Sequence, residues 1–184
     1  MKVLQSKEQL QEWLDAANID TALWGEGNAK RVEHLFDELL AGEACLQDNP
    51  PLRLVDVVQI IVRRGKQILL EAEQELKNGQ IRFRNQPPSE KIKAGESYTD
   101  AALRCFREEL GVAETAVAFL PHTYTQIESA TDSLSYPGLK TCYTFHMIEA
   151  KVEGLPNEDF WRDNAAFDAG DPVKRHRWTW RYSR

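Results

Sequence analysis

The chain has 184 residues, which is enough for one domain of ordinary size or for one domain with a modest extension. Hydrophobic residues make up 42% and charged residues 28%, and no apolar run approaches the roughly 20 residues that cross a bilayer, so we expect a cytoplasmic protein without a membrane contact. The three scattered cysteines argue against a disulfide framework and a zinc site, and the net charge of -6 gives no general reason to expect nucleic-acid binding.

Two amphipathic helices are predicted in the N-terminal part of the chain. Ser6 followed by Gln9 is typical of a capping box, and the first helix is expected to extend to about Ala17. The second helix is expected to start near Asn28 and to stop at Gly42. Apolar residues at helical spacing are expected to be buried, namely Leu10, Trp13, Leu14 and Ala17 in the first helix and Val32, Leu35, Phe36, Leu39 and Leu40 in the second.

Two consecutive prolines, Pro50 and Pro51, interrupt this helical pattern, because proline cannot continue a helix. We therefore predict a boundary at this point. Residues 1–49 are expected to form an N-terminal helical extension, and residues 50–184 are expected to form the main domain.

The pattern after the prolines is typical of strands. Residues 52–62 are rich in β-branched side chains, which favour extended structure. Asn78-Gly79 is a strong hairpin signal, so a strand near residues 69–75 is expected to pair with another near residues 81–84.

Further strands are predicted in the C-terminal half of the chain, over residues 115–120 and 140–152. Between them, the polar segment 128–139 is expected to form a long loop. Trp178 and Trp180 alternate with polar residues, as in a final strand pressed against the core. Strands around one loop-helix unit, with helices on the flanks, indicate an α/β (α+β) fold.

The segment Glu90–Val112, EKIKAGESYTDAALRCFREELGV, carries the candidate chemistry. Ser97 begins a capping signal, and Gly111 is a natural end for the helix that follows. Near that end, Glu108 and Glu109 offer two consecutive carboxylates, which are hard oxygen ligands suited to magnesium or manganese. Taken alone, this pair is more simply interpreted as a solvated part of an amphipathic helix.

The spacing of the whole segment resembles the Nudix box. That box has Gly, five residues, Glu, seven residues, Arg-Glu, an apolar residue, any residue, Glu-Glu, any residue, Gly and an apolar residue. The positions that match are Glu96, Arg104, Phe106, Glu108, Glu109, Gly111 and Val112. The resemblance covers the box well and residues 53–153 more loosely, and it implies an α/β/α sandwich with a mixed sheet.

Two positions depart from the Nudix pattern. Glu90 replaces the opening Gly, and Cys105 replaces the Glu that follows the Arg. A thiol at this position removes one hard ligand and one negative charge, so cation binding is expected to be weaker. Cys105 is expected on the exposed side of the helix beside Glu108 and Glu109. The Glu90 side chain points either inward as a substitute ligand or, as we favour, outward as an ordinary loop residue.

In the Nudix family the box glutamates hold a divalent cation that bridges the diphosphate and activates water. The resemblance implies Mg²⁺ or Mn²⁺ bound by Glu96, Glu108 and Glu109, with weak or absent binding if the box is inactive. It implies catalytic roles for Glu109 and Glu108 and a general base outside the box, for which Glu128 is the preferred candidate, although a single Glu in a polar loop is otherwise solvated. Structural support is implied for Arg104, Gly95 and Gly111.

The resemblance also implies a nucleotide-type small molecule as the substrate. Its base would stack on an aromatic ring, and Tyr124 and Tyr136, in or beside the polar segment, are the candidates. The expected activity is hydrolysis of a nucleoside diphosphate linked to another moiety. The alternative, favoured by Cys105, is a catalytically inactive module that binds a nucleotide or a protein partner. The N-terminal helices could form that partner surface or a homodimer contact.

Overall fold

The structure is a computed structural model that describes residues 4–27, 29–169 and 171–182. The chain divides into two compact units. Unit 1 contains Met1–Val57, Lys91–Glu96 and Ile127–Phe145, and unit 2 contains Val58–Glu90, Ser97–Gln126 and His146–Arg184. The boundary predicted at residue 50 stays a prediction.

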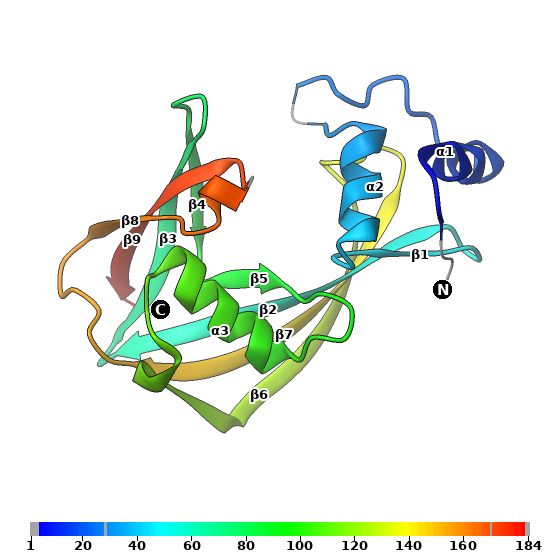
Figure 1. The fold of residues 1–184 in the computed structure, drawn as a ribbon. Helices are drawn as coiled ribbons and strands as arrows, with labels where there is room; N and C mark the ends of the chain where they lie inside the picture. Colours follow the sequence, from blue (N-terminus) through cyan, green and yellow to red (C-terminus); the bar gives the residue numbers. More distant parts are fainter. Residues whose placement is uncertain (1–3, 28, 170, 183–184) are drawn as a thin grey trace. The chain divides into compact units, whose positions relative to one another are not determined.

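Two helices precede the strands along the described residues, and a third helix lies between β5 and β6 (Figure 1). The helices are α1 (Lys7–Ala16), α2 (Val32–Leu40) and α3 (Tyr98–Glu109), with short 3-10 turns η1 (Glu114–Ala116) and η2 (Phe167–Ala169). The strands are β1 (Cys45–Gln47), β2 (Leu52–Arg64), β3 (Gln67–Leu76), β4 (Ile81–Gln86), β5 (Ser89–Lys91), β6 (Val117–Asp132), β7 (Lys140–Val152), β8 (Phe160–Asp163) and β9 (Val173–Tyr182). In the described part of the chain, no helix combines the length and the apolarity that a transmembrane span requires.

The strands hydrogen-bond in the order β6-β7-β2-β3-β9-β8, while β1 and β5 pair with β2 and β4 pairs with β3. The pairs β1–β2, β2–β3, β3–β4, β3–β9 and β8–β9 are antiparallel. A sheet of this kind, combined with separate helices, confirms the predicted α+β class.

In unit 1, α1 and α2 bury their apolar faces in one hydrophobic core. Ser6 caps α1 as predicted, because its Oγ accepts a hydrogen bond from Gln9 N at 3.3 Å. Helix α2 begins at Val32, later than predicted, and the expected start near Asn28 lies outside the described residues. Leu40 is 64% exposed, so its predicted burial is wrong. The core contains Leu10, Trp13, Leu14, Ile19, Trp24, Leu35, Phe36, Leu46, Tyr136 and Leu139.

A buried group of charges connects α2 to β2 in unit 1. The Glu38 carboxylate lies 2.5 Å from Arg53 Nη2, 2.7 Å from Lys30 Nζ and 3.2 Å from Lys91 Nζ. The Glu38 and Arg53 side chains are 7% and 3% exposed, and the Arg53 guanidinium lies over the Tyr136 ring. Burial alone would raise the pKa of Glu38, but the three cations outweigh it and lower this pKa to about 2.

In unit 2, β3 pairs with β2, β4 and β9. The Asn78-Gly79 turn joins β3 to β4 as predicted, and Gly79 adopts a φ of 80°, which glycine reaches without strain. A β-bulge between Glu71 and Glu73 interrupts the register of β3 with both β4 and β9. Bulges of this kind redirect side chains and are frequent beside functional sites.

Strand β6 is longer than predicted. It extends from Val117 to Asp132, so the expected long loop over residues 128–139 is reduced to residues 133–139. The second half of β6 is exposed along its length, and no apolar alternation marks it as a strand. The predicted position of Glu128 at the start of a loop is therefore wrong, whereas β7 has the predicted bounds.

Candidate active site

Helix α3 carries most of the box residues, and its predicted ends are confirmed. The Ser97 Oγ accepts a hydrogen bond from Asp100 N at 3.1 Å, while the Asp100 carboxylate accepts one from Ser97 N at 3.4 Å. Gly111 follows the helix with a φ of 64°, the left-handed conformation that closes many helices. The helix is thus held at a defined length, which sets the position of its last residue, Glu109.

Glu109 meets two side chains that lie outside the box. Glu71 from β3 and His176 from β9 each offer a ligand atom, and these atoms and one from Glu109 all lie within 4.8 Å of one another. His176 Nδ1 is 2.5 Å from Glu71 Oε1 and 3.9 Å from Glu109 Oε2. No other group of three such residues with this spacing occurs in the described residues. We call this group the Glu–Glu–His cluster.

The cluster is shielded from solvent. The side chains of His176, Glu71 and Glu109 are 1%, 5% and 17% exposed. Burial raises the pKa of Glu109 well above its ordinary value, and the negative charge of Glu71 raises it further. Burial acts on Glu71 in the same direction, but the hydrogen bond with His176 and the charges of His176 and Arg84 prevail and lower its pKa. The Glu109 carboxyl is therefore the member that lacks sufficient positive charge.

Local packing explains how the two strand residues reach the helix. His176 lies two residues before the buried Trp178 on β9, so both side chains point to the same face of the strand. Trp178 Nε1 donates a hydrogen bond to the Glu109 carbonyl oxygen at 3.3 Å, which ties the end of α3 to β9. Glu71 lies at the β3 bulge, and its second oxygen accepts a hydrogen bond from Arg84 Nε at 3.2 Å.

The sequence interpretation did not identify Glu71 or His176. One signal was available for each. Glu71 follows the apolar residues 68–70 of a predicted core strand, and His176 occupies an inward position two residues before Trp178. A charged or titratable residue at an inward position of a strand is unusual enough to indicate a site.

Glu108 lies outside the Glu–Glu–His cluster. Its Oε1 is 3.8 Å from Arg107 Nη2, and its side chain is 26% exposed. Arg104 Nη1 lies 3.3 Å from Glu90 Oε2. Glu90 thus turns toward the box helix, and the outward orientation that we favoured is wrong. The cause is the positive charge of Arg104 on α3, which attracts the Glu90 carboxylate.

Cys105 is completely buried, whereas we expected it on the exposed side of α3. It faces the core together with Ala101, Ala102 and Phe106. Burial raises its pKa well above the ordinary thiol value, and the negative charge of Glu109 raises it further. The residue therefore stays a neutral thiol and supplies neither the charge nor the oxygen ligand of the Glu that it replaces.

Glu96 and Gly95 belong to unit 1, whereas Glu108 and Glu109 belong to unit 2. The Glu96 carboxylate accepts a hydrogen bond from Lys93 N at 2.9 Å, and Gly95 adopts a φ of 81° in the same turn. Both residues line a pocket of about 570 Å³ in unit 1. A cation shared by Glu96 and the box carboxylates of α3 stays a prediction.

The other two residues predicted near the polar segment have different surroundings. Glu128 is exposed on β6 in unit 1. Tyr136 is 0% exposed and lies in the unit 1 core, with its ring beneath the Arg53 guanidinium. Its ring is buried in this structure, and its use by a base stays a prediction.

Tyr124 lies on β6 in unit 2 as part of an aromatic group. Its ring stacks on that of Tyr98 with a centroid distance of 4.8 Å, and its hydroxyl is 2.9 Å from His146 Nδ1. All three side chains are half-buried. The group offers a partly exposed aromatic surface beside the start of α3, and its use by a base stays a prediction.

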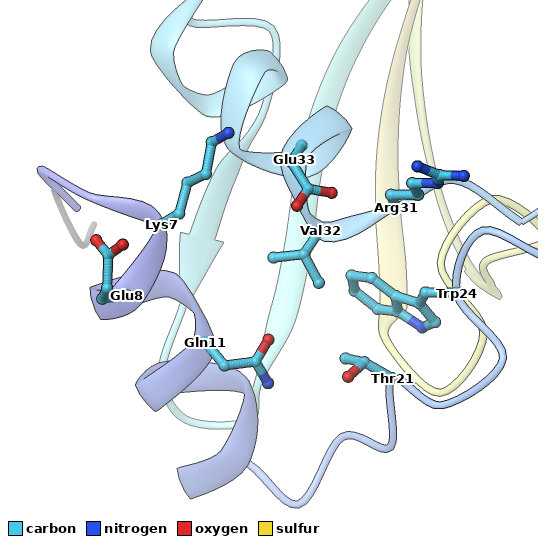
Figure 2. A pocket seen from close by; sticks show the side chains of 8 residues that line it. All are labelled: Lys7, Glu8, Gln11, Thr21, Trp24, Arg31, Val32 and Glu33. Carbon is cyan, nitrogen blue, oxygen red and sulfur yellow. The ribbon is translucent and has the colours of Figure 1, made fainter.

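A second pocket in unit 1, of about 450 Å³, lies between the two N-terminal helices (Figure 2). Lys7 and Gln11 from α1 face Val32 and Glu33 from α2 across it, and the Trp24 ring forms part of its wall. Charges of both signs line the pocket, so it has no clear preference for an anion or a cation.

The comparison with known families agrees with this arrangement. The sequence model of the NUDIX domain matches residues 52–178. The chain therefore belongs to the NUDIX family. No curated protein matches it.

Several solved structures are similar at low sequence identity. A NUDIX hydrolase from Nitrosomonas europaea is 18% identical, with 68% of this chain and 71% of that chain covered and a TM-score of 0.43. An Ap4A hydrolase from C. elegans is 14% identical, with 70% of this chain and 79% of that chain covered and a TM-score of 0.38. An ADP compounds hydrolase is 21% identical, with 68% of this chain and 57% of that chain covered and a TM-score of 0.32. Similarity at this level does not assign a substrate.

Proposed function

We propose that this protein is a cation-dependent hydrolase of a nucleoside diphosphate linked to another moiety. Membership of the NUDIX family supports the reaction class. The observation that carries the proposal is the position of Glu109, a box carboxylate, beside the Glu71 carboxylate in a shielded site. Arg84 and His176 already contact Glu71, so Glu109 is the carboxylate that gains most from a further positive charge, and a dication supplies it.

The residues of the site fit a divalent cation such as Mg²⁺ or Mn²⁺. Carboxylate oxygens are the ligands that both ions prefer, and a dication would favour the ionised form of Glu109, whose pKa is otherwise raised by burial. We propose Glu109 as the principal ligand, with Glu108 as a further box ligand on the same helix. Such an ion neutralises the charge of a diphosphate and lowers the pKa of bound water.

The remaining roles concern the chain's own residues. Arg104 is proposed as a positioning residue, since its contact with Glu90 supports the face of α3 that carries the box. Glu128, exposed on β6, is proposed as the general base that orients water. The aromatic group of Tyr124 is proposed to stack on the base.

A substrate screen tests the proposal. ADP-ribose, dinucleoside polyphosphates and NADH would each be incubated with Mg²⁺ and with Mn²⁺, and phosphate-containing products would be measured. We expect turnover of at least one compound that requires the cation and stops with a chelator. Absence of turnover for every compound with either ion would contradict the proposal, and an unchanged rate in Glu128→Gln would remove Glu128 as the base.

The specific observation that favours a second function is the neutral, buried thiol of Cys105 in place of a box carboxylate. With one ligand fewer, the fold could hold a nucleotide without hydrolysing it. In that case the N-terminal helices, with the pocket between them, are the proposed contact for a protein partner or a second copy. Equilibrium binding of ADP-ribose without turnover in the same screen would support this second function.

Replacement of Cys105 by Glu tests whether the lost carboxylate limits the reaction. We expect Mg²⁺-dependent turnover to rise about tenfold or more, because a hard oxygen ligand is added beside Glu109. Without a cation the variant should be less stable, since a further carboxyl is buried next to two others. Kinetics and thermal unfolding with and without Mg²⁺ measure both effects.

The matched control is Cys105→Gln, which has nearly the same volume as the Glu variant but no charge. It should not gain turnover. Equal rates for the Glu variant, the Gln variant and the unaltered protein would show that the site is remodelled beyond the box.

A further inference from the structure

The donor atoms of the Glu–Glu–His cluster come from three elements that are distant in sequence. Glu109 ends α3, while Glu71 lies on β3 and His176 on β9, 105 residues further along the chain than Glu71. Neither strand residue belongs to the box. Their meeting with Glu109 is therefore a property of the tertiary structure and of this chain.

We propose that Glu71 and His176 complete the cation site in place of the box carboxylate lost at Cys105, and that the resulting site binds Mn²⁺ in preference to Mg²⁺. Glu71 supplies a carboxylate to the same region that Glu109 occupies, with their ligand atoms within 4.8 Å. The inference rests on the proposed function for the use of a cation, but it does not require turnover.

The imidazole nitrogen of His176 decides the preference between Mn²⁺ and Mg²⁺. Mg²⁺ favours a complete set of oxygen ligands, whereas Mn²⁺ shares the preference for carboxylates and, as a transition metal, accepts an imidazole nitrogen more readily. One nitrogen with two carboxylate oxygens is therefore a better match for Mn²⁺ than for Mg²⁺. A cation bound by both His176 and Glu71 takes the place of the proton in their 2.5 Å hydrogen bond. That proton passes to Nε2 if the ring is neutral, or to solvent if Nε2 is already protonated, so that His176 binds through Nδ1 as a neutral imidazole.

A second observation concerns His176 itself. Its side chain is 1% exposed, and its Nε2 is buried without a hydrogen-bond partner among the described residues. Nδ1, not Nε2, faces the two carboxylates, so Nε2 is the nitrogen that keeps the ring proton while Nδ1 offers its lone pair to a cation. The β-bulge at Glu71 adds to this, because it interrupts two strand pairings at the residue that the cluster uses.

An interpretation of the cluster as a structural ion pair does not account for the position of Glu109. His176 and Arg84 both contact Glu71, so a pair or triad centred on Glu71 is complete without Glu109. Glu109 then remains as a shielded carboxyl beside other acids. A dication gives Glu109 a closer positive charge than His176, whose Nδ1 is 3.9 Å away, and it also uses the histidine as a ligand.

Metal binding to the full-length protein, freed of cations with a chelator, tests the inference. Mn²⁺ binding would be measured by EPR and by calorimetry, and Mg²⁺ binding by competition. We expect Mn²⁺ to bind at least tenfold more tightly than Mg²⁺. Glu71→Gln and His176→Gln should each weaken Mn²⁺ binding at least tenfold. Unchanged Mn²⁺ affinity in both variants, or equal affinity for the two ions, would overturn the inference.

Matched controls separate this site from ordinary surface binding. Glu73→Gln changes a neighbouring β3 carboxylate that pairs with Arg177, and His122→Gln changes an exposed histidine. Both should keep the Mn²⁺ affinity within about twofold, a change that corresponds to less than about 0.5 kcal/mol. A loss in the controls as large as in Glu71→Gln would also contradict the assignment.

A further measurement is needed because buried variants can fail to fold. The chain has four histidines, His34, His122, His146 and His176. Replacement of the first three by Gln leaves His176 as the remaining one, and pulsed EPR of bound Mn²⁺ detects a directly coordinated nitrogen. A nitrogen coupling in this variant supports the inference, and bound Mn²⁺ without it overturns it.

The outcomes for the two proposals are distinguishable. If Mn²⁺ binds through His176 but no compound is hydrolysed, the hydrolase proposal fails and the cation site stands. If hydrolysis and Mn²⁺ affinity are both unchanged in Glu71→Gln and His176→Gln, the hydrolase proposal stands and this inference fails.

Discussion

Replacement of Glu109 by Gln is expected to reduce cation-dependent hydrolysis by about 100-fold or more. Glu109 is the box carboxylate that the structure brings into the Glu–Glu–His cluster, so its loss removes a ligand from the proposed cation. The fold should tolerate the change. Burial already raises the pKa of Glu109, and the neutral amide resembles the protonated carboxyl in shape and charge. Steady-state kinetics with saturating Mn²⁺ measure the effect.

Two further variants make the result for Glu109 specific. Glu114→Gln alters a carboxylate of η1 that lies 3.3 Å from Arg107, and it should retain full activity. Glu108→Gln tests the second box carboxylate. Because Glu108 lies outside the cluster, this variant should reduce cation-dependent hydrolysis less than Glu109→Gln does. Full activity in Glu109→Gln would place the chemistry elsewhere in the protein.

Replacement of Glu38 by Gln is expected to destabilise the protein by about 3–5 kcal/mol at neutral pH. The change leaves the Arg53 guanidinium, which is 3% exposed, without its buried counter-charge. Urea unfolding measures the free-energy difference. Lys30→Gln is the control, because Lys30 is 44% exposed and an exposed partner contributes at most about 1 kcal/mol. Equal stability of the Glu38 variant and the unaltered protein would contradict the importance of this pair.

The same carboxyl gives the stability a defined dependence on pH. The pKa of Glu38 is lowered from 4.5 to about 2 on folding, so the folded state binds its proton less readily than the unfolded state. The contribution, about 3 kcal/mol from this difference, is complete above the unfolded pKa and is lost as the pH falls through about 2. The Glu38→Gln variant should lack this part of the acid sensitivity. Parallel stability curves for both proteins between pH 5 and pH 2 would show that the ion pair has no such role.

Local signals predicted the parts of the fold whose interactions are local. The cap at Ser97, the left-handed Gly111 and the turn at Asn78-Gly79 each depend on residues a few positions apart. Their predictions are confirmed because the hydrogen bonds and the backbone conformations that define them form within one turn. The same holds for β7, whose apolar residues mark its whole length.

The positions that were predicted wrongly depend on neighbours that one segment does not reveal. The second half of β6 is exposed on its described faces, so strand pairing alone defines it. Tyr136 lies in the polar loop as predicted, but its burial against α1, α2 and Arg53 was not foreseen. Glu90 turned toward Arg104 because of a charge on a different element.

The sequence by itself determined the NUDIX resemblance, the box helix and the loss of a carboxylate at Cys105, because spacing along a single helix specifies all three. Only the tertiary structure decided which side chains accompany Glu109. Glu71 and His176 are 105 residues apart and meet through the pairing of β3 with β9. Pairing of distant strands is a long-range property, and no local pattern of residues encodes it.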